Sequence, residues 1–570
     1  MRRAFFLIPL SFVVSCLLIA CDTSKLVIEG QHAIISTSTG KLRGHVHAKG
    51  PDQDLPEELN LKHGPVLEFL GFPYARAERW KDPEQYTWHG IKDALEFGSV
   101  CPSEPTQGFY YGREDCLAMS IWAPLDVATK KPVLVWFPTA SFELFSVANP
   151  ALSGRHIAAQ ENVVFVSLNS RAGALGYLRL QLDDGTLLEG NYGIKDQIFA
   201  LQWIQKNIHL FGGDPDRVTL MGDGAGGQTV GLHMVSIPAS EDLFHSGIPQ
   251  SNFLAPLRTA AQAEAMGQQF LKFTGCNLTP DPLACLQALP ARLIVAAQSY
   301  YSAVQLNLTI PNLRKLKYQQ VAEAGGYYRT AVETWQPVVD GSLIVRQPVD
   351  GTFQKPVMMG HNLNEGRYIG AYINGTKRIY DRAGFIERYL TPAFGADNVS
   401  TITGYPGYRM TPANWRSVWY QMMTDAFFAC PMRTMAKNSA SSAPLRIYRF
   451  DHHPNITEPL SLTYHLWSGT PNLCNPDGVV CHGAESPFSH KYLPLLFGSQ
   501  EWDLSSRMIA YYANFARTDD PNGTGLPDWP AATPTDLKYT LLDYTQTDVN
   551  DPYRDVCEQV WDRVGYTLDD

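Results

Sequence analysis

Four glycines within six residues, at positions 222, 224, 226 and 227, separate two apolar segments and constrain the fold more than any other feature. Val218–Met221 before them has the composition of a short buried strand, and Gly227–Met234 after them can form a helix. Upstream, apolar residues recur at helical spacing: Ile194, Ile198, Leu201, Ile204 and Ile208. Two glycines and a proline within residues 211–215 end that helix. The predicted order is helix, breaker, strand, tight turn, helix.

The tight turn has the sequence Gly222-Asp223-Gly224-Ala225-Gly226. In a G-x-S-x-G motif, a strand-to-helix turn of this kind lifts a serine oxygen into the active site. Gly224 occupies the serine position and has no side-chain atom that could attack a carbonyl. It also adopts positive φ without the strain, about 1–3 kcal/mol, that another residue would store there. Ordinary serine hydrolysis is therefore not expected.

Further motifs follow one another along the chain. They are residues 69–75, 114–117, 169–176, 191–197, 512–518 and 520–522. Together with the glycine turn, they resemble the type-B carboxylesterase and cholinesterase family over nearly the whole chain. The resemblance implies an α/β-hydrolase fold, in which a mostly parallel, twisted central sheet is flanked by helices. We expect one large domain over residues 26–565.

The resemblance also implies the acid and the base of a catalytic triad. Glu365 lies in an N-x-x-E-G context that begins at Asn362, and His482 lies in an H-G-x-E context. Such a histidine takes the proton of a serine, and the carboxylate orients the imidazole and stabilises its charged form. Without a serine at position 224 there is no such proton to move. Glu365 and His482 are therefore expected to remain as a buried, hydrogen-bonded pair that stabilises its loops.

The predicted oxyanion hole departs from the family pattern. Where the family has a glycine run after a hydrophobic strand, here Val133–Phe137, this chain has Pro138 followed by Thr139, Ala140 and Ser141. Proline lacks an N–H group, and Cβ atoms disfavour glycine-like backbone conformations. The N–H groups of Ala140, Ser141 and Ala225 could still converge. Removing one such donor typically lowers the rate by about a hundred- to a thousand-fold.

Three other groups are candidate replacement nucleophiles. Asp223 precedes the turn position and is expected to point away from the line of attack. Ser251 matches a structural segment after the next strand, and Ser141 lies in the altered oxyanion loop. Ser141 is the least implausible of the three, but triad chemistry depends on sub-ångström placement.

Asp451-His452-His453 could suggest a metal site. An exposed turn after the strand Leu445–Phe450 is the favoured interpretation of these residues. No cofactor is expected.

The N-terminal residues resemble a targeting signal. Residues 1–20 combine a positive start with an apolar stretch, as in a secretory signal peptide. Leu18–Cys21 resembles a bacterial lipoprotein box with Cys21 as the lipid-bearing residue, and a simple secretory signal is the alternative. Six N-glycosylation sequons instead suit a eukaryotic glycoprotein: Asn277, Asn307, Asn374, Asn398, Asn455 and Asn522. The sequence therefore leaves both a bacterial and a eukaryotic origin open.

Ten cysteines agree with an oxidising compartment, and two of them, Cys16 and Cys21, fall within or beside the signal. The family resemblance implies three disulfides among the rest: Cys101–Cys116, Cys276–Cys285 and Cys430–Cys557. Cys474 and Cys481 remain and could close a short loop before His482. The loop closed by the first disulfide, residues 102–115, lacks the tryptophan with which cholinesterases hold a quaternary ammonium group. Choline ester hydrolysis is therefore not indicated.

Composition limits the partners. A net charge of −10 argues against nucleic-acid binding, and no segment after residue 25 is long and apolar enough to span a membrane. Two functions remain. The first is a secreted, non-catalytic esterase-like protein that binds a protein partner or a small ester-like ligand. The second is a carboxylic ester hydrolase with residual or unconventional activity.

Overall fold

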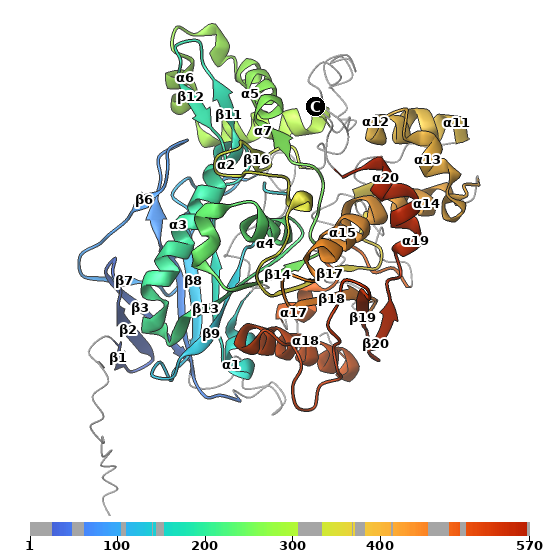
Figure 1. Cartoon of the computed structure of the whole chain (residues 1–570). Helices are drawn as coiled ribbons and strands as arrows, with labels where there is room; N and C mark the ends of the chain where they lie inside the picture. The colour runs from blue at the N-terminus through green and yellow to red at the C-terminus, as the bar shows by residue number, and fades with distance from the viewer. Residues whose placement is uncertain are drawn as a thin grey trace, which may run out of the picture.

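A central sheet organises the chain in the computed structural model (Figure 1). The structure describes residues 26–47, 62–103, 110–139, 141–143, 153–305, 333–367, 369–370, 382–411, 414–453, 478–490 and 498–566. The expected signal segment 1–20 and Cys21 lie outside these residues. Within the described ranges, no helix has the length and apolar character needed to cross a membrane.

The central sheet has 14 strands among the described residues. In spatial order they are β1 (Leu26–Glu29), β2 (His32–Ser36), β3 (Lys41–His47), β4 (Val66–Pro73), β8 (Ala118–Pro124), β10 (Val164–Leu168), β9 (Lys131–Trp136), β13 (Gly213–Asp223), β14 (Ser246–Gln250), β17 (Val357–Asn362), β18 (Leu445–Phe450), β19 (Lys538–Leu542) and β20 (Thr547–Asn550), with β7 (Ile91–Asp93) paired to β3. The strands from β10 to β19 run parallel, whereas the strands at both ends pair antiparallel. This mostly parallel sheet confirms the predicted α/β fold class.

Helices lie on both sides of the sheet (Figure 1). The longer ones are α3 (Tyr192–Asn207), α4 (Ala225–Val235), α5 (Ala260–Thr274), α7 (Ala291–Gln305), α14 (Trp415–Thr424), α15 (Cys430–Ser439) and α18 (Ser499–Thr518). The predicted helix after the glycine turn is α4, and it begins two residues earlier than expected, at Ala225. The upstream helix predicted from its isoleucines is α3.

The alternation of side chains along β9 shows why the strand is apolar throughout. Val133 and Val135 pack into the core that also contains Trp203 of α3. Leu134 and Trp136 point to the opposite face and pack into the core that contains residues of α18. A strand covered on both faces has no solvent side, so its sequence is a continuous apolar run rather than an alternating one. Trp136 and Trp203 are both core residues.

The turn at residues 451–453 was predicted to be exposed, and for His452 this prediction is wrong. His452 is only 3% exposed. Its Nδ1 lies 3.0 Å from Asp543 Oδ1, and its Nε2 lies 3.2 Å from Glu501 Oε1. Two carboxylates contributed from other elements hold this imidazole, and neither is close in the sequence. Among the residues that the structure describes, no group of three or more His, Cys, Asp or Glu side chains is arranged to hold a metal ion.

Three disulfides are present among the described residues, and they are the pairs that the family resemblance implies: Cys101–Cys116, Cys276–Cys285 and Cys430–Cys557. Cys474 lies outside the described residues, so its pairing with Cys481 stays a prediction. Three bridges in one chain favour an oxidising compartment.

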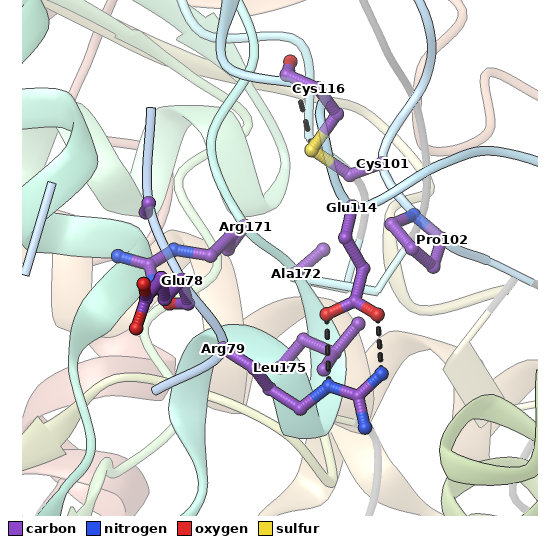
Figure 2. A pocket seen from close by; sticks show the side chains of 10 residues that line it. Glu78, Arg79, Cys101, Pro102, Glu114, Cys116, Arg171, Ala172 and Leu175 are labelled. Carbon is purple, nitrogen blue, oxygen red and sulfur yellow. Dashed lines mark hydrogen bonds and ion pairs between the residues drawn. A yellow bond between two sulfur atoms is a disulfide. The ribbon is translucent and has the colours of Figure 1, made fainter. Parts of the chain in front are cut away.

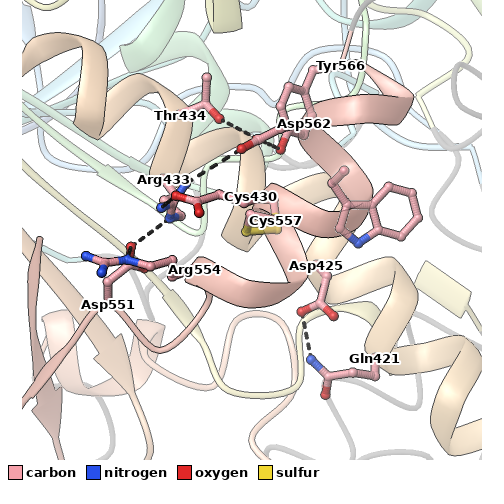
Figure 3. Close-up of a disulfide and its surroundings, with 12 residues drawn as sticks. Gln421, Asp425, Cys430, Arg433, Thr434, Asp551, Arg554, Cys557, Asp562 and Tyr566 are labelled. Carbon is pink, nitrogen blue, oxygen red and sulfur yellow. Dashed lines mark hydrogen bonds and ion pairs between the residues drawn. A yellow bond between two sulfur atoms is a disulfide. The ribbon is translucent and has the colours of Figure 1, made fainter. Parts of the chain in front are cut away.

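The third disulfide attaches the C-terminal segment to the helical layer (Figure 3). Cys430 begins α15, and Cys557 begins the π-helical turn η11 (Cys557–Trp561). Beside the bridge, the buried Arg433 side chain donates to Asp551 at 2.8 Å and to Glu558 at 2.7 Å. A covalent bond and two charge-assisted hydrogen bonds therefore hold the same two segments together.

This arrangement predicts unequal effects of two disulfide deletions. Cys430→Ser with Cys557→Ser opens a loop with a sequence separation of 127 residues, and Cys276→Ser with Cys285→Ser opens one of 9 residues. Loop-closure entropy predicts losses of unfolding free energy of about 5 and about 2.5 kcal/mol, respectively. Urea unfolding of both double variants would measure the difference. Equal losses would contradict the entropic origin of this stabilisation.

Candidate active site

The glycine turn joins the end of β13 to the start of α4 at very close packing distance. A Cβ atom on Gly222 would lie 2.5 Å from the carbonyl carbon of Gly226. A Cβ atom on Gly226 would lie 2.4 Å from the carbonyl oxygen of Phe137. Only glycine fits at these two positions, because backbone atoms cannot move away as a flexible side chain can. Packing therefore requires glycine at the first and last positions of the G-x-G-x-G sequence.

Gly224 occupies the point of the turn. Its backbone angles are φ 59° and ψ −120°, a conformation that L-residues rarely adopt. A Cβ atom placed on Gly224 would lie 2.7 Å from Nε2 and 3.1 Å from Cε1 of His482, and it would meet no other heavy atom within 4 Å apart from the adjoining residues. The imidazole therefore faces the α-carbon directly. It stands in space that a side chain at this position would need.

His482 and Glu365 form the predicted hydrogen-bonded pair. The Nδ1 atom of His482 lies 2.6 Å from Glu365 Oε2, and the Glu365 side chain is fully buried. Burial by itself lowers the pKa of the imidazole, but the charge and hydrogen bond of Glu365 outweigh it and raise the pKa from 6.5 to about 9. Burial raises the pKa of Glu365, yet the charge of His482 brings it below its usual value. At neutral pH the pair is an imidazolium and a carboxylate.

A second acidic layer surrounds this ion pair. Glu485 accepts hydrogen bonds from Ser251 Oγ at 2.7 Å and from the Tyr448 hydroxyl at 2.6 Å. Asp223 accepts a hydrogen bond from the Ser486 hydroxyl. Burial, together with the neighbouring carboxyl groups, raises the pKa values of Glu485 and Asp223. These two acids therefore resist ionisation, and Glu365 is the carboxylate that pairs with the charge of His482.

The replacement nucleophiles are placed as follows. Ser251 is fully buried; its hydroxyl donates to Glu485 and accepts from Asn362 Nδ2 at 2.9 Å. Asp223 belongs to the acidic layer described above. Ser141 is half-buried in the oxyanion loop. The hydrogen bonds of Ser251 direct its hydroxyl into a carboxyl cluster, which is no environment for an attacking oxygen.

The oxyanion positions are only partly described. Ala140 lies outside the described residues. Ser141 has φ 50° and its neighbour Phe142 has φ 55°. The loop thus adopts the left-handed conformation expected of glycine, although both residues carry Cβ atoms that make it costly. Ala225 is the first residue of α4, where N–H groups have no partner within the helix.

A pocket lies beside the first disulfide (Figure 2). It holds about 290 Å³ of empty space, part of it open to solvent, and is lined in part by Arg79, Glu114, Arg171 and Leu175. Arg79 pairs with Glu114 through a bond of 2.9 Å, and Arg171 pairs with the buried Asp196 at 2.7 and 2.8 Å. Both guanidinium charges are balanced. This pocket does not include Gly224, Glu365 or His482.

Comparisons with known proteins agree with the fold and the motif order. The profile described as "Carboxylesterase family" matches residues 31–561. The chain belongs to the carboxylesterase family.

Similar relatives in this family include enzymes of two kinds. Cocaine esterase of Homo sapiens is 29% identical over 564 residues, which covers 90% of this chain and 89% of that protein. Acetylcholinesterase of Bungarus fasciatus is 29% identical over 557 residues, which covers 89% of this chain and 82% of that protein. Among solved structures, a PNB esterase superposes with a TM-score of 0.71 at 25% identity and covers 92% of this chain and 99% of its own.

Sequence reasoning about this carboxylesterase-family protein missed the partners of the second acidic layer. Tyr448 and Glu485 are separated by 37 residues, and Ser251 and Glu485 by 234. No motif of the sequence links them. The one available signal was Tyr448 on the predicted strand Leu445–Phe450, because a buried tyrosine hydroxyl needs a hydrogen-bond partner.

The contact between His482 and Gly224 predicts the effect of a side chain at this position. Gly224→Ala places its Cβ 2.7 Å from a ring nitrogen that Glu365 holds in position, and it adds the cost of positive φ. Gly30→Ala is the matched control, since Gly30 has φ 63° and open space around its Cβ position. We expect Gly224→Ala to lower the unfolding free energy by at least about 1 kcal/mol more than the control. Equal losses in urea unfolding would mean that the imidazole moves aside freely.

The raised pKa of His482 predicts a pH dependence of stability. The folded-state pKa of about 9 exceeds the ordinary pKa of 6.5, so stabilisation is complete below pH 6.5 and is lost as the pH rises through 9. The shift corresponds to a free energy on the order of 3 kcal/mol. His482→Gln cannot titrate and should show a flatter stability profile between these pH values. Parallel profiles for the two proteins would contradict the ion pair.

Proposed function

We propose that this protein is a secreted, non-catalytic member of the carboxylesterase family that binds a small ligand or a partner. The observation that carries the proposal is the contact at the turn, where Nε2 of His482 lies 2.7 Å from the Cβ position of Gly224. A family esterase needs a nucleophile at this point and an imidazole set back to receive its proton. Here the residue has no side chain and the imidazole fills the gap.

The protonation of the site supports the same conclusion. A general base must be neutral to accept a proton, whereas the pKa of about 9 keeps His482 charged at neutral pH. Loss of a triad nucleophile lowers the rate by about a million-fold in a well-studied serine protease. The Glu365–His482 pair is then an ion pair that stabilises two loops, and its hydrogen-bond geometry does not by itself imply turnover.

Secretion is part of the proposal. Residues 1–20 are proposed as a signal peptide, with lipid attachment at Cys21 as the alternative to simple release, and both lie outside the described residues. The three disulfides support an oxidising compartment. The domain proposed over residues 26–565 contains the matched range 31–561.

An ester hydrolysis assay tests the non-catalytic function against the alternative of residual hydrolysis. The native protein should hydrolyse p-nitrophenyl acetate no faster than His482→Ala, because no proton transfer passes through that imidazole. An organophosphonate probe should leave no covalent adduct on any side chain in peptide mass mapping. Turnover that His482→Ala abolishes, or a labelled residue near the turn, would overturn the proposal.

The Gly224→Ser variant extends the same experiment. A new serine needs His482 to withdraw from its present position, so we expect turnover to stay at least about a hundred-fold below that of a family esterase assayed in parallel. The PNB esterase is a suitable positive control. Full activity in Gly224→Ser would show that the imidazole position adapts to the side chain.

A further inference from the structure

Two histidines face each other on neighbouring strands near one edge of the central sheet (Figure 1). His32 of β2 pairs with His45 of β3 in the antiparallel register. Directly opposed residues project from the same face of a sheet, with Cβ atoms about 4.5–5.5 Å apart. The two imidazole ring centroids lie 5.7 Å apart, and the ring planes are inclined by 32°. Both residues are half-buried, so their rings keep contact with solvent.

The ring of His45 has a defined tautomer. Its Nε2 atom lies 3.2 Å from the carbonyl oxygen of Leu95. A carbonyl oxygen only accepts hydrogen bonds, so Nε2 carries a proton and donates it. In the neutral ring, Nδ1 then holds a lone pair. A hydrogen bond from the other ring nitrogen to a backbone carbonyl is one of the interactions that orient metal-ligating histidines in proteins.

The ring of His32 is unconstrained by comparison. Among the residues that the structure describes, its imidazole makes no hydrogen bond or ion pair, and its ring contact is with His45. Rotation about its side-chain bonds can therefore turn a ring nitrogen toward Nδ1 of His45 without breaking another interaction.

A third histidine on the same face is already engaged. His47 lies two residues beyond His45, and the two ring centroids are 5.8 Å apart. The Nε2 atom of His47 lies 2.9 Å from Oε1 of the buried Glu68. Glu68 also accepts hydrogen bonds from Arg155 and from Trp122. Moving the ring of His47 toward a shared ligand would disturb this network, whereas His32 has no such bond to lose.

The separation of His32 and His45 suits a metal ion bound between them. Zn²⁺ binds imidazole nitrogens at about 2.0–2.1 Å, which places the ring centroids of two imidazoles on one tetrahedral ion about 5 Å apart. The observed separation of 5.7 Å is slightly larger, and small side-chain rotations would close the difference. Within the described ranges no third His, Cys, Asp or Glu completes the set, so water molecules would fill the other positions.

Imidazole ligands select the class of metal. Neutral imidazoles suit Zn²⁺, Cu²⁺ and Ni²⁺, whereas Mg²⁺ and Ca²⁺ prefer oxygen ligands. At a given nitrogen site, Cu²⁺ generally binds more tightly than Zn²⁺. Glu29 of β1 pairs with His32 in the register and is exposed. Its negative charge beside the two imidazoles favours a cation.

We propose that His32 and His45 bind one divalent transition-metal ion, with Cu²⁺ bound more tightly than Zn²⁺. The site lies apart from the glycine turn, because β4, β8, β10 and β9 separate β3 from β13 in the sheet. Metal binding is therefore independent of whether residue Gly224 permits hydrolysis, and the two can fail separately.

Metal titration of the full-length protein, prepared without an affinity tag, tests the site. Calorimetry at pH 7 should show one Zn²⁺ site per chain, and an excess of Mg²⁺ or Ca²⁺ should leave it unchanged. In electron paramagnetic resonance spectra, Cu²⁺ at this site should show two nitrogen ligands. Absence of a Zn²⁺ site, or a Cu²⁺ spectrum without nitrogen ligands, would overturn the proposal.

Substitutions identify the ligands. His32→Gln and His45→Gln each remove one ligand and should weaken Zn²⁺ binding at least about tenfold. His89→Gln is the matched control, since His89 is exposed and lies two residues before β7, which pairs with β3. His89→Gln and His47→Gln should keep the affinity of the native protein. Full affinity in His32→Gln or His45→Gln, or a loss of the same size in His47→Gln, would show that the ligands are assigned wrongly.

Melting temperatures separate the loss of a ligand from unfolding. Circular dichroism first establishes that each variant is folded without metal. Zn²⁺ should then raise the melting temperature of the native protein and of His89→Gln, because a ligand that binds only the folded state stabilises it. It should leave the melting temperatures of His32→Gln and His45→Gln unchanged. A rise of the same size in all four proteins would place the metal elsewhere and refute the proposal.

Discussion

The approach of His482 to the α-carbon of Gly224 is the contact on which the rest of the site depends. It requires a residue without a side chain at the turn, since a Cβ atom there would lie 2.7 Å from Nε2. It also requires a turn that cannot relax, and the glycines at 222 and 226 provide that by packing against backbone atoms. The rigid turn and the oriented imidazole together close the space in which acyl chemistry takes place in a serine esterase.

The Glu365–His482 pair has a reason to persist without catalysis. The charge and hydrogen bond of Glu365 raise the pKa of His482 most, so the imidazolium offsets the charge of a fully buried carboxylate. Removing one partner of a buried ion pair commonly costs about 3–5 kcal/mol, because the other charge is left uncompensated. An intact acid and base are therefore weak evidence for activity in this fold. The nucleophile position is the better indicator of activity, because a side chain there serves catalysis and contributes nothing to packing.

The sequence predicted the backbone of this site better than its side-chain partners. Gly224, the α/β sheet and the order of the motifs follow from local patterns, because glycine and apolar runs act within a few residues of themselves. The exposed turn predicted at His452 was wrong, since its two carboxylate neighbours lie 49 and 91 residues away. The partners of Glu485 went unnoticed for the same reason, since Tyr448 and Ser251 lie 37 and 234 residues away. A sequence gives the type of a buried polar residue, but its partner, or the lack of one, is a property of the fold.

Loss of the nucleophile in this fold is harder to reverse than a single substitution suggests. Glycine removes the strain of a positive φ at the turn, worth about 1–3 kcal/mol, and so stabilises the backbone. The imidazole then occupies the vacated space, where its raised pKa further stabilises the folded state at neutral pH. Reintroducing serine would restore the backbone strain and displace a charged ring from its carboxylate. Both features, the glycine at the turn and the imidazole against it, stabilise the fold and oppose acyl chemistry, which agrees with the non-catalytic function proposed above.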